Sequence, residues 1–378
     1  MEKTYISRRQ LFTLIYAYIL SNELTRGIYL YHYRQSTWIP VLLAIPLSCF
    51  LFFVYSFIYK NTDYPDFKTA MERILGKFFS KILIFIYFFY FLLLFALKLR
   101  DLVELVSIYT MQDSPFWMLY AFYLLVAIYC AVKGIEVIAR YSGLVFAITF
   151  FSFVLFFVLL AIVNEPEFQN LLPFMPHSFL EFVNPTLRMA YRVPLGELFP
   201  ILVIFQYVRP EQKRQAVKTS YFGIAAIGVT LLIISIANIV YLEAEALILG
   251  YAPIVRLWRR IDIEDFIQRL DLVMVNILLL NVMVKSGVLF VAVKAMADGI
   301  KEIKKGQIIF YGLLSIGLMA LLLFLARDYP KILNIRFRIL IPYLISTFEV
   351  FIPILVVIIS FFRKKQAAGA EKQVEYNI

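Results

Sequence analysis

Long apolar runs separated by short charged connections dominate this sequence and limit the folds it can adopt. Of the 378 residues, 62% are hydrophobic and 17% are charged, and the mean hydropathy is +0.80. A run of about 20 apolar residues is the length that crosses a hydrocarbon core of roughly 30 Å as an α-helix. The sequence therefore predicts an all-α integral membrane protein, for which the bilayer is the solvent.

The apolar runs divide into ten windows, which predict about ten transmembrane helices. They fall at residues 9–33, 37–59, 79–109, 115–132, 139–163, 184–208, 217–241, 263–297, 307–326 and 338–361. The third and eighth windows are too long for upright spans and predict tilted or projecting helices. We expect one transmembrane domain over residues 1–362 and a disordered polar tail over residues 363–378.

Three segments between these windows predict shorter helices. Residues 64–81 carry apolar side chains at helical spacing with lysines between them, which is typical of a helix lying in the membrane interface. The connections at residues 164–186 and 243–266 exceed ordinary loop length and predict short surface helices.

The charged and nucleophilic residues exclude several classes of function. Most Lys and Arg residues fall in alternate connections, so the positive-inside rule places both termini in the cytoplasm. The net charge of +11 does not indicate nucleic-acid binding, because the cations lie in short connections at the ends of apolar runs and not along one soluble face. His32, His177, Cys49 and Cys130 fit no metal-ligand spacing, and no phosphate loop or nucleophile motif occurs. We therefore expect no cofactor, no metal site and no enzymatic activity.

Polar residues interrupt two of the predicted spans. The break in the first span includes Ser21, Asn22, Glu23, Leu24 and Thr25, and extends to Gly27; the break in the sixth includes Val193, Pro194, Leu195, Gly196 and Glu197. Each break lies in the first span of a five-span half. The pair predicts a 5+5 inverted repeat, over residues 6–163 and 184–361, with a ligand near the bilayer midplane between spans one and six. The alternative is a proline kink in span six and a shallow end to helix one.

Ionisable residues inside the spans form the second set of candidates. On span three, Lys98 with Asp101 and Arg100 with Glu104 have the spacing of neutralising pairs, for which a structural role is favoured. Lys285, deep in span eight, has no carboxylate at helical spacing and needs a partner from elsewhere. The candidate partners are Glu197, the backbone carbonyls of the helix-one break, and Glu349. Two roles stay open for Lys285: a built-in substitute for a sodium ion at those carbonyls, and a buried structural pair; Lys285 and Glu197 are also the candidates for proton coupling.

Eight short runs, in order along the chain, carry a family resemblance. They are ISRRQLF from Ile6, ILGKFFSKI from Ile74, LRDLVELV from Leu99, KGIEVIAR from Lys133, NLLP from Asn170, PLGE from Pro194, FIQRLD from Phe266 and VKSGVLF from Val284. Together they resemble the endospore germination permease family, the B subunit of GerA-type spore germinant receptors. The resemblance implies a LeuT-like fold of the amino acid, polyamine and organocation transporter superfamily, with helices 1 and 6 broken, in the inner membrane of a bacterial spore.

The same resemblance implies partners and a binding site. The expected partners are the receptor A and C subunits and a small germinant, often an amino acid. The implied ligand-facing positions are Ser21 to Thr25, Leu102, Pro194 to Glu197, Ser286 and Phe290. Ser21 and Asn22 stand where relatives commonly have Gly followed by a small residue, which predicts an altered pocket floor. The alternatives to a receptor are a proton-coupled transporter of an amino acid or organic cation, and a scaffold without a ligand.

Overall fold

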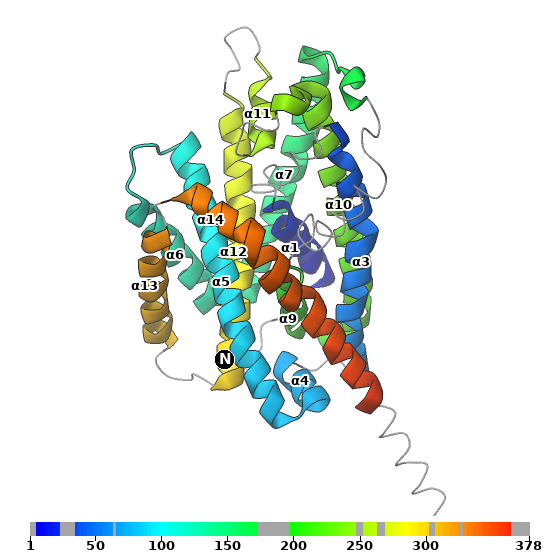
Figure 1. The fold of residues 1–378 in the computed structure, drawn as a ribbon, viewed down its shortest axis with the longest axis vertical. Helices are drawn as coiled ribbons and strands as arrows, with labels where there is room; N and C mark the ends of the chain where they lie inside the picture. The colour runs from blue at the N-terminus through cyan, green and yellow to red at the C-terminus, as the bar shows by residue number, and fades with distance from the viewer. Residues whose placement is uncertain are drawn as a thin grey trace, which may run out of the picture.

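The computed structural model of the protein is a bundle of helices (Figure 1). It describes residues 5–22, 35–62, 66–172, 197–246, 252–262, 269–301, 307–325 and 328–363. Across these ranges the regular structure is helical, apart from one isolated bridge between Ile6 and Val208. Six helices are long and apolar enough to cross a membrane, and two shorter apolar helices, Phe116–Cys130 and Ile309–Phe324, accompany them. The all-helical membrane fold predicted from hydropathy is confirmed.

Eight of the predicted windows coincide with helices of the structure. These are α3 (Trp38–Asn61), α5 (Lys77–Tyr109), α6 (Phe116–Lys133), α7 (Ile135–Val163), α10 (Lys213–Ala246), α12 (Asp271–Ile300), α13 (Gln307–Leu325) and the last span, which runs from α14 (Tyr329–Ile335) through η5 (Arg336–Ile345) and η6 (Thr347–Phe351) to residue 363. The helices α5 and α12 are long, as expected, at 33 and 30 residues, and α10 reaches 34.

The last span begins nine residues earlier than the hydropathy window at residue 338. Asp328 caps its start by accepting a hydrogen bond from the Lys331 backbone N–H at 3.1 Å. The prediction that Arg336 belongs to a connection is therefore wrong, because Arg336 lies within this helix and is buried. Around Pro342, which has no N–H to donate, the span takes a π-helical form that continues to Phe351.

The two windows with polar breaks are described only in part. The first contributes α1 (Arg8–Leu20), and the sixth contributes α9 (Phe199–Ile204) followed by the 3₁₀ turn η3 (Phe205–Tyr207). Residues 23–34 and 173–196 lie outside the described ranges. The two broken helices, the ten-span count and the inverted repeat therefore stay predictions.

The shorter elements differ in how well the sequence predicted them. The predicted segment 64–81 contains α4 (Phe67–Leu75), which is capped by Asp66, and the start of α5; Gly76, whose φ of 84° favours glycine, separates the two helices. The connection at 164–186 contains the exposed turn η2 (Phe168–Leu171). In contrast, α11 (Pro253–Arg259) is not the expected surface helix: Trp258 is only 2% exposed and stacks on Phe156 with ring centroids 4.2 Å apart. Burial against α10 and α12 explains its apolar sequence.

The helix α12 lies at the centre of the bundle, with α5, α7, α1, α6, α9 and α11 packed around it. The short α1 is enclosed by α10, α7 and α12, and its residues from Leu14 to Leu20 are all buried (Figure 1). Peripheral helices expose large apolar side chains instead, among them Phe122, Phe151 and Phe324 at 60%, 71% and 75%. An apolar exterior around a buried polar centre is the arrangement expected in lipid.

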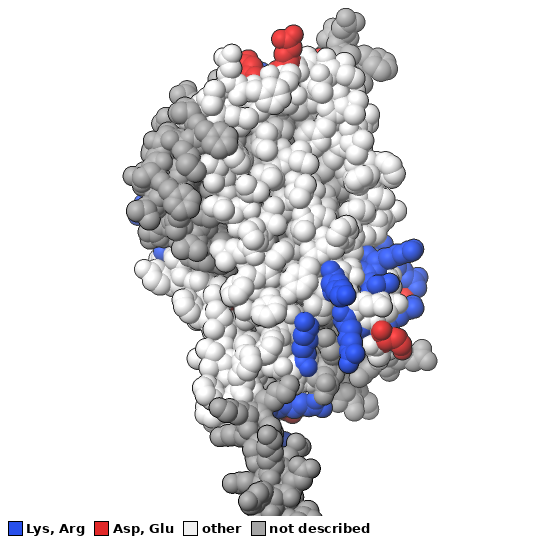
Figure 2. Space-filling model, turned by 90° about the vertical axis from the view of Figure 1, so that its right-hand side faces the viewer, with Lys and Arg blue, Asp and Glu red and all other residues white. Residues whose placement is uncertain are grey.

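Charged side chains are unevenly distributed along the bundle. Figure 2 shows Lys and Arg gathered in the lower half of one face, below a largely uncharged surface that reaches the acidic side chains at the top. The exposed cations include Arg8 and Arg9 at the start of α1 and Arg214 and Lys218 near the start of α10. The starts of these two helices adjoin, because Arg8, Arg9 and Thr219 line one groove.

Candidate functional site

Local hydrogen bonds end α1 at the predicted break in span one. The helix starts with a capping box between Ser7 and Gln10, and it ends where the Ser21 hydroxyl donates to the Tyr18 carbonyl at 2.6 Å. The Asn22 backbone N–H then donates to the Ile19 carbonyl at 3.0 Å. These bonds close a turn, so the Asn22 side chain projects from the end of a buried helix.

The described chain resumes at Glu197 with an unusual backbone conformation. Its φ of 71° lies in the left-handed region, which carries a steric cost for residues other than glycine. The Tyr18 hydroxyl, from the last turn of α1, donates to the Glu197 carbonyl at 2.8 Å. Two residues later α9 begins, with Pro200 in its first turn, where the missing N–H is tolerated. The end of α1 thus contacts the chain directly before α9.

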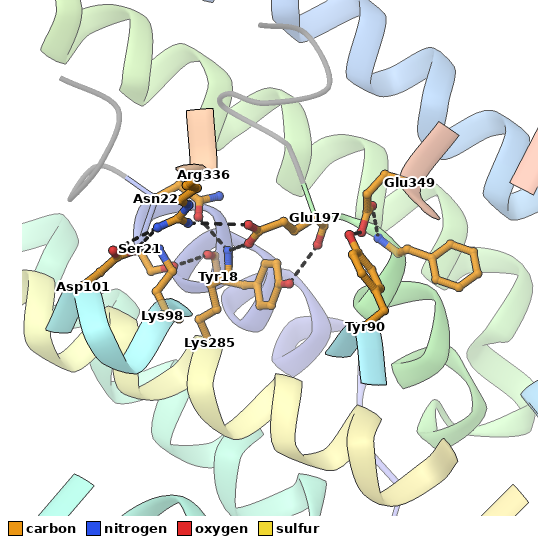
Figure 3. Close-up of polar contacts among 11 residues, drawn as sticks. Tyr18, Ser21, Asn22, Tyr90, Lys98, Asp101, Glu197, Lys285, Arg336 and Glu349 are labelled. Atoms are coloured by element: carbon orange, nitrogen blue, oxygen red, sulfur yellow. Dashed lines mark hydrogen bonds and ion pairs between the residues drawn. The ribbon is translucent and has the colours of Figure 1, made fainter. Parts of the chain in front are cut away.

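Lys285 joins these two segments to the middle of α12 (Figure 3). Its ammonium donates to Asn22 Oδ1 at 2.6 Å, forms an ion pair with Glu197 Oε2, and lies 4.6 Å from the centroid of the Tyr18 ring. Lys285 is completely buried. A buried ammonium is tolerated only with such partners, since desolvation costs several kcal/mol.

The three candidate partners of Lys285 can now be compared. Glu197 is in contact, whereas Glu349 bonds to residues of other helices. The nearby oxygen from the first break is the side-chain Oδ1 of Asn22. The backbone carbonyls of residues 23–27 lie outside the described ranges, and the sodium-substitute role of Lys285 stays a prediction.

A second ion-pair group continues from this site towards α5. Asp101 accepts two hydrogen bonds from one Arg336 nitrogen, at 2.9 and 2.7 Å, and one from the Tyr329 hydroxyl at 3.1 Å. Lys98 lies 3.4 Å from Asp101, as its spacing predicted, and Arg336 lies 3.8 Å from Glu197 Oε1. We call Lys98, Asp101, Glu197, Lys285 and Arg336 the ion-pair cluster. It holds three cations and two carboxylates, all at most 8% exposed.

The other predicted ligand-facing residues occupy three different settings. Leu102 is fully buried on α5, and Phe290, on α12, packs edge-on against Phe95 with ring centroids 5.1 Å apart. The Ser286 hydroxyl is buried beside Lys285 and makes no hydrogen bond within the described part of the chain. Glu23, Leu24, Thr25, Val193, Pro194, Leu195 and Gly196 lie outside it. Of the predicted set, the structure brings Ser21, Asn22, Glu197 and Lys285 together.

Comparison with known proteins places the chain within a family. The family model described as "Spore germination protein" matches residues 5–332. The chain belongs to the spore germination protein family. It is 26% identical to spore germination protein KB of Bacillus subtilis over 97% of each chain. It is also 24% identical to YndE of the same organism over 61% of this chain and 62% of YndE, and 26% identical to GerQB of Bacillus cereus over 40% and 41%. The resemblance noted from the eight short runs is confirmed.

This spore germination protein buries a further carboxylate outside the ion-pair cluster. Glu349, on η6, accepts hydrogen bonds from the Tyr90 hydroxyl at 2.7 Å, the Tyr55 hydroxyl at 3.0 Å and the Phe199 backbone N–H at 2.9 Å. Sequence reasoning considered Glu349 only as a partner for Lys285. Its position in an apolar run was a signal of function, but the helices that supply its donors could not be inferred from one sequence.

Proposed function

We propose that this chain is the B subunit of a spore germinant receptor, which binds a small nutrient germinant where α1 ends and α9 begins. One observation supports this most directly: Lys285 of α12 contacts both Asn22, after α1, and Glu197, before α9. A molecule bound there touches segments that the sequence separates by more than 170 residues. Its binding energy can therefore act on the relative positions of three elements.

The chemistry of the site suits an amino acid. The ion-pair cluster presents both ammonium or guanidinium groups and carboxylates, which complement the two charges of a zwitterion. The other proposed ligand-facing side chains on α5 and α12 include the apolar Leu102 and Phe290, which are both buried. Ser21 to Thr25 and Val193 to Glu197 supply the walls in this proposal, through backbone groups at two helix breaks.

The Ser286 hydroxyl is one donor available to such a ligand within the described part of the chain. Several other buried serines in long helices satisfy their hydroxyl groups locally, although Ser80 on α5 does not: Ser220 donates to the Ala216 carbonyl at 3.0 Å and Ser315 donates to the Tyr311 carbonyl at 2.6 Å. Ser286, equally buried, makes no such bond within the described residues. A buried hydroxyl costs free energy unless it finds a partner, and a bound germinant would supply one.

Germinant binding acts as a signal if the two arrangements of these helices bind it with different affinity. In this proposal the shift is passed to A and C subunits in the inner membrane of the spore. In this proposal the basic end of the bundle faces the spore core and contacts the anionic headgroups of the leaflet on that side. The positive-inside rule predicts that both termini lie on the same side. The names of the relatives, spore germination protein KB and GerQB, support a role in spore germination but do not identify the partner subunits.

Replacement of Ser286 tests the binding site with little disturbance of the fold. The assay uses spores that carry this chain as their single B subunit and adds amino acids one at a time. An amino acid that lowers the optical density of the spore suspension is an active germinant. Ser286→Ala should raise the concentration for a half-maximal response about five- to tenfold, which corresponds to one hydrogen bond. Ser220→Ala, a matched buried serine on α10, should leave it unchanged at equal protein levels. Equal sensitivity of both variants would contradict the proposed site.

A proton-coupled transporter is the second candidate, because the buried Lys285 and Glu197 pair could exchange protons during a transport cycle. Uptake of a labelled amino acid into vesicles that contain this chain alone distinguishes the two functions. The receptor proposal expects no accumulation above protein-free vesicles, whereas accumulation driven by a pH gradient would favour the transporter.

A further inference from the structure

Glu349 is stabilised in a different way from every other buried carboxylate described above. Its side chain is completely buried, and its three donors come from three different elements: Tyr55 on α3, Tyr90 on α5 and the backbone of Phe199 at the start of α9. Within the described residues, the hydrogen bonds and ion pairs of this carboxylate include no Lys or Arg. Three neutral donors therefore replace the solvation that water would give; Figure 3 shows one of them, Tyr90, beside Glu349.

Tyr55 can satisfy the Glu349 carboxyl group in two protonation states. Its hydroxyl oxygen lies 3.0 Å from Glu349 Oε2 and 2.5 Å from the Glu349 backbone carbonyl oxygen. A phenol has one proton to donate and can also accept. With Glu349 ionised, the proton points to the carboxylate; with Glu349 protonated, it turns to the carbonyl, and the phenol oxygen accepts the new carboxyl proton. With Glu349 protonated, both the carboxyl group and the backbone carbonyl have a partner. With Glu349 ionised, the backbone carbonyl loses the Tyr55 proton, and Pro353, four residues on, has no N–H to replace it.

The neighbours of Glu349 place it in a position to act on α9. The titratable groups that face it are Tyr55 from α3, Tyr87 and Tyr90 from α5, Tyr18 from α1 and Glu197 from the segment before α9. The Tyr87 hydroxyl donates to the neighbouring Phe348 carbonyl at 2.8 Å, and the Tyr87 and Phe199 rings stack with centroids 4.5 Å apart. Glu349 and the ion-pair cluster thus bond to opposite ends of residues 197–199.

We propose that Glu349 is a reversible proton-binding site that couples the last span to the start of α9. A hydronium ion of the aqueous phase transfers a proton to the carboxylate and becomes water, the negative charge of Glu349 disappears, and Tyr55 redirects its own proton to the Glu349 carbonyl. The Phe199 N–H then donates to a neutral carboxyl oxygen instead of an anion, and a hydrogen bond to an anion is roughly twice as strong. Proton binding therefore loosens the first turn of α9. The consequence for germinant sensitivity rests on the proposed function; proton binding and the coupling to α9 do not.

Infrared spectroscopy of the full chain in lipid nanodiscs tests the proton site without a germinant. As the pH is lowered from about 9 to 4, a buried carboxylic-acid band should appear in the wild type. The band should be absent in Glu349→Gln and retained in Glu104→Gln, a matched variant whose carboxylate pairs with Arg100 at the 17% exposed edge of α5. Tyr55→Phe, which keeps the carboxyl group but removes one donor to its anion, should increase the proton affinity about tenfold.

Amide hydrogen exchange at one alkaline pH tests the coupling, since Glu349→Gln imitates the protonated form. Residues 199–204 should exchange about fivefold faster in Glu349→Gln than in the wild type or in Glu104→Gln. A band that persists in Glu349→Gln, or a wild type without any titrating band, would overturn the proton site. A titrating band with unchanged exchange would overturn the coupling. Should Glu349→Gln fail to fold, an unaltered proton affinity in Tyr55→Phe would also overturn the proposal.

Discussion

Two buried carboxylates, Glu197 and Glu349, flank the start of α9 and are stabilised by opposite means. Glu197 pairs with the Lys285 ammonium and lies 3.8 Å from Arg336, so its charge is balanced by cations. Glu349 is held by two phenol hydroxyls and one backbone N–H. Both are at most 8% exposed, so burial alone does not distinguish them.

The difference lies in what each carboxylate loses on neutralisation. A proton on Glu197 leaves the Lys285 charge buried without its carboxylate, and an uncompensated buried charge costs several kcal/mol. A proton on Glu349 leaves no cation behind, because its donors are neutral. The contact of Glu197 with Lys285 is therefore costly to break, whereas the contact of Glu349 with the start of α9 can weaken by protonation without leaving a buried charge. Variants that separate charge balance from hydrogen bonding can test this contrast.

The largest effect is expected from Lys285→Met, which removes the ammonium in direct contact with the Glu197 carboxylate and leaves Arg336 at 3.8 Å. We expect the free energy of unfolding to fall by about 3 to 5 kcal/mol, the cost of breaking a buried pair from one side. Denaturant titration of the purified protein in detergent micelles would measure it. Adding Glu197→Gln to Lys285→Met should restore much of the loss, because the carboxylate that lost its contacting ammonium is then neutral as well. If the double variant lost as much free energy of unfolding as Lys285→Met and Glu197→Gln lose together, charge balance would be refuted as the cause.

An intermediate effect is expected from Asp101→Asn. Arg336 then loses its ion pair with Asp101, and the neutral amide oxygen can accept at most one of the two hydrogen bonds at 2.9 and 2.7 Å. The expected loss is about 2 to 3 kcal/mol in the same titration. Glu104→Gln is the control, because its pair with Arg100 lies at a partly exposed edge, where the loss should stay below about 1 kcal/mol. Similar losses in the two variants would show that the Asp101–Arg336 pair, which links α5 to the last span, contributes little to the free energy of unfolding.

Sequence reasoning succeeded where the physical cause is local. Apolar length predicted α5 and α12, amphipathic spacing predicted α4, and positions three and four residues apart predicted the Lys98 and Arg100 pairs on α5. In each case the residues that carry the signal lie within one helix. The polar stretch at Ser21 and Asn22 likewise marks the point where α1 ends.

Sequence reasoning failed where the physical cause is a contact between segments that are distant in the sequence. The hydropathy window of the last span began at residue 338 because Arg336 and Arg338 reduce the local average, yet the Arg336 charge is neutralised by Asp101, 235 positions away. Lys285 had three possible partners, and only the arrangement of α1, α9 and α12 distinguishes them. For Glu349, nothing in a sequence with 25 tyrosines singles out Tyr55 and Tyr90 as its donors.

The smallest effect is expected from Tyr90→Phe, which removes one of three neutral donors to Glu349 and leaves its ring stacked on Phe348, with centroids 4.5 Å apart. The expected loss is about 1.5 to 2 kcal/mol, the value of a hydrogen bond to a charged group. Tyr16→Phe, which removes a hydroxyl bonded to neutral Thr230 at 3.0 Å, should cost about 1 kcal/mol or less. The gap between the two should disappear in a Glu349→Gln background, where both bonds are neutral. If it persists there, ring packing rather than the Glu349 charge distinguishes these tyrosines, and the two carboxylates differ less than their contacts indicate.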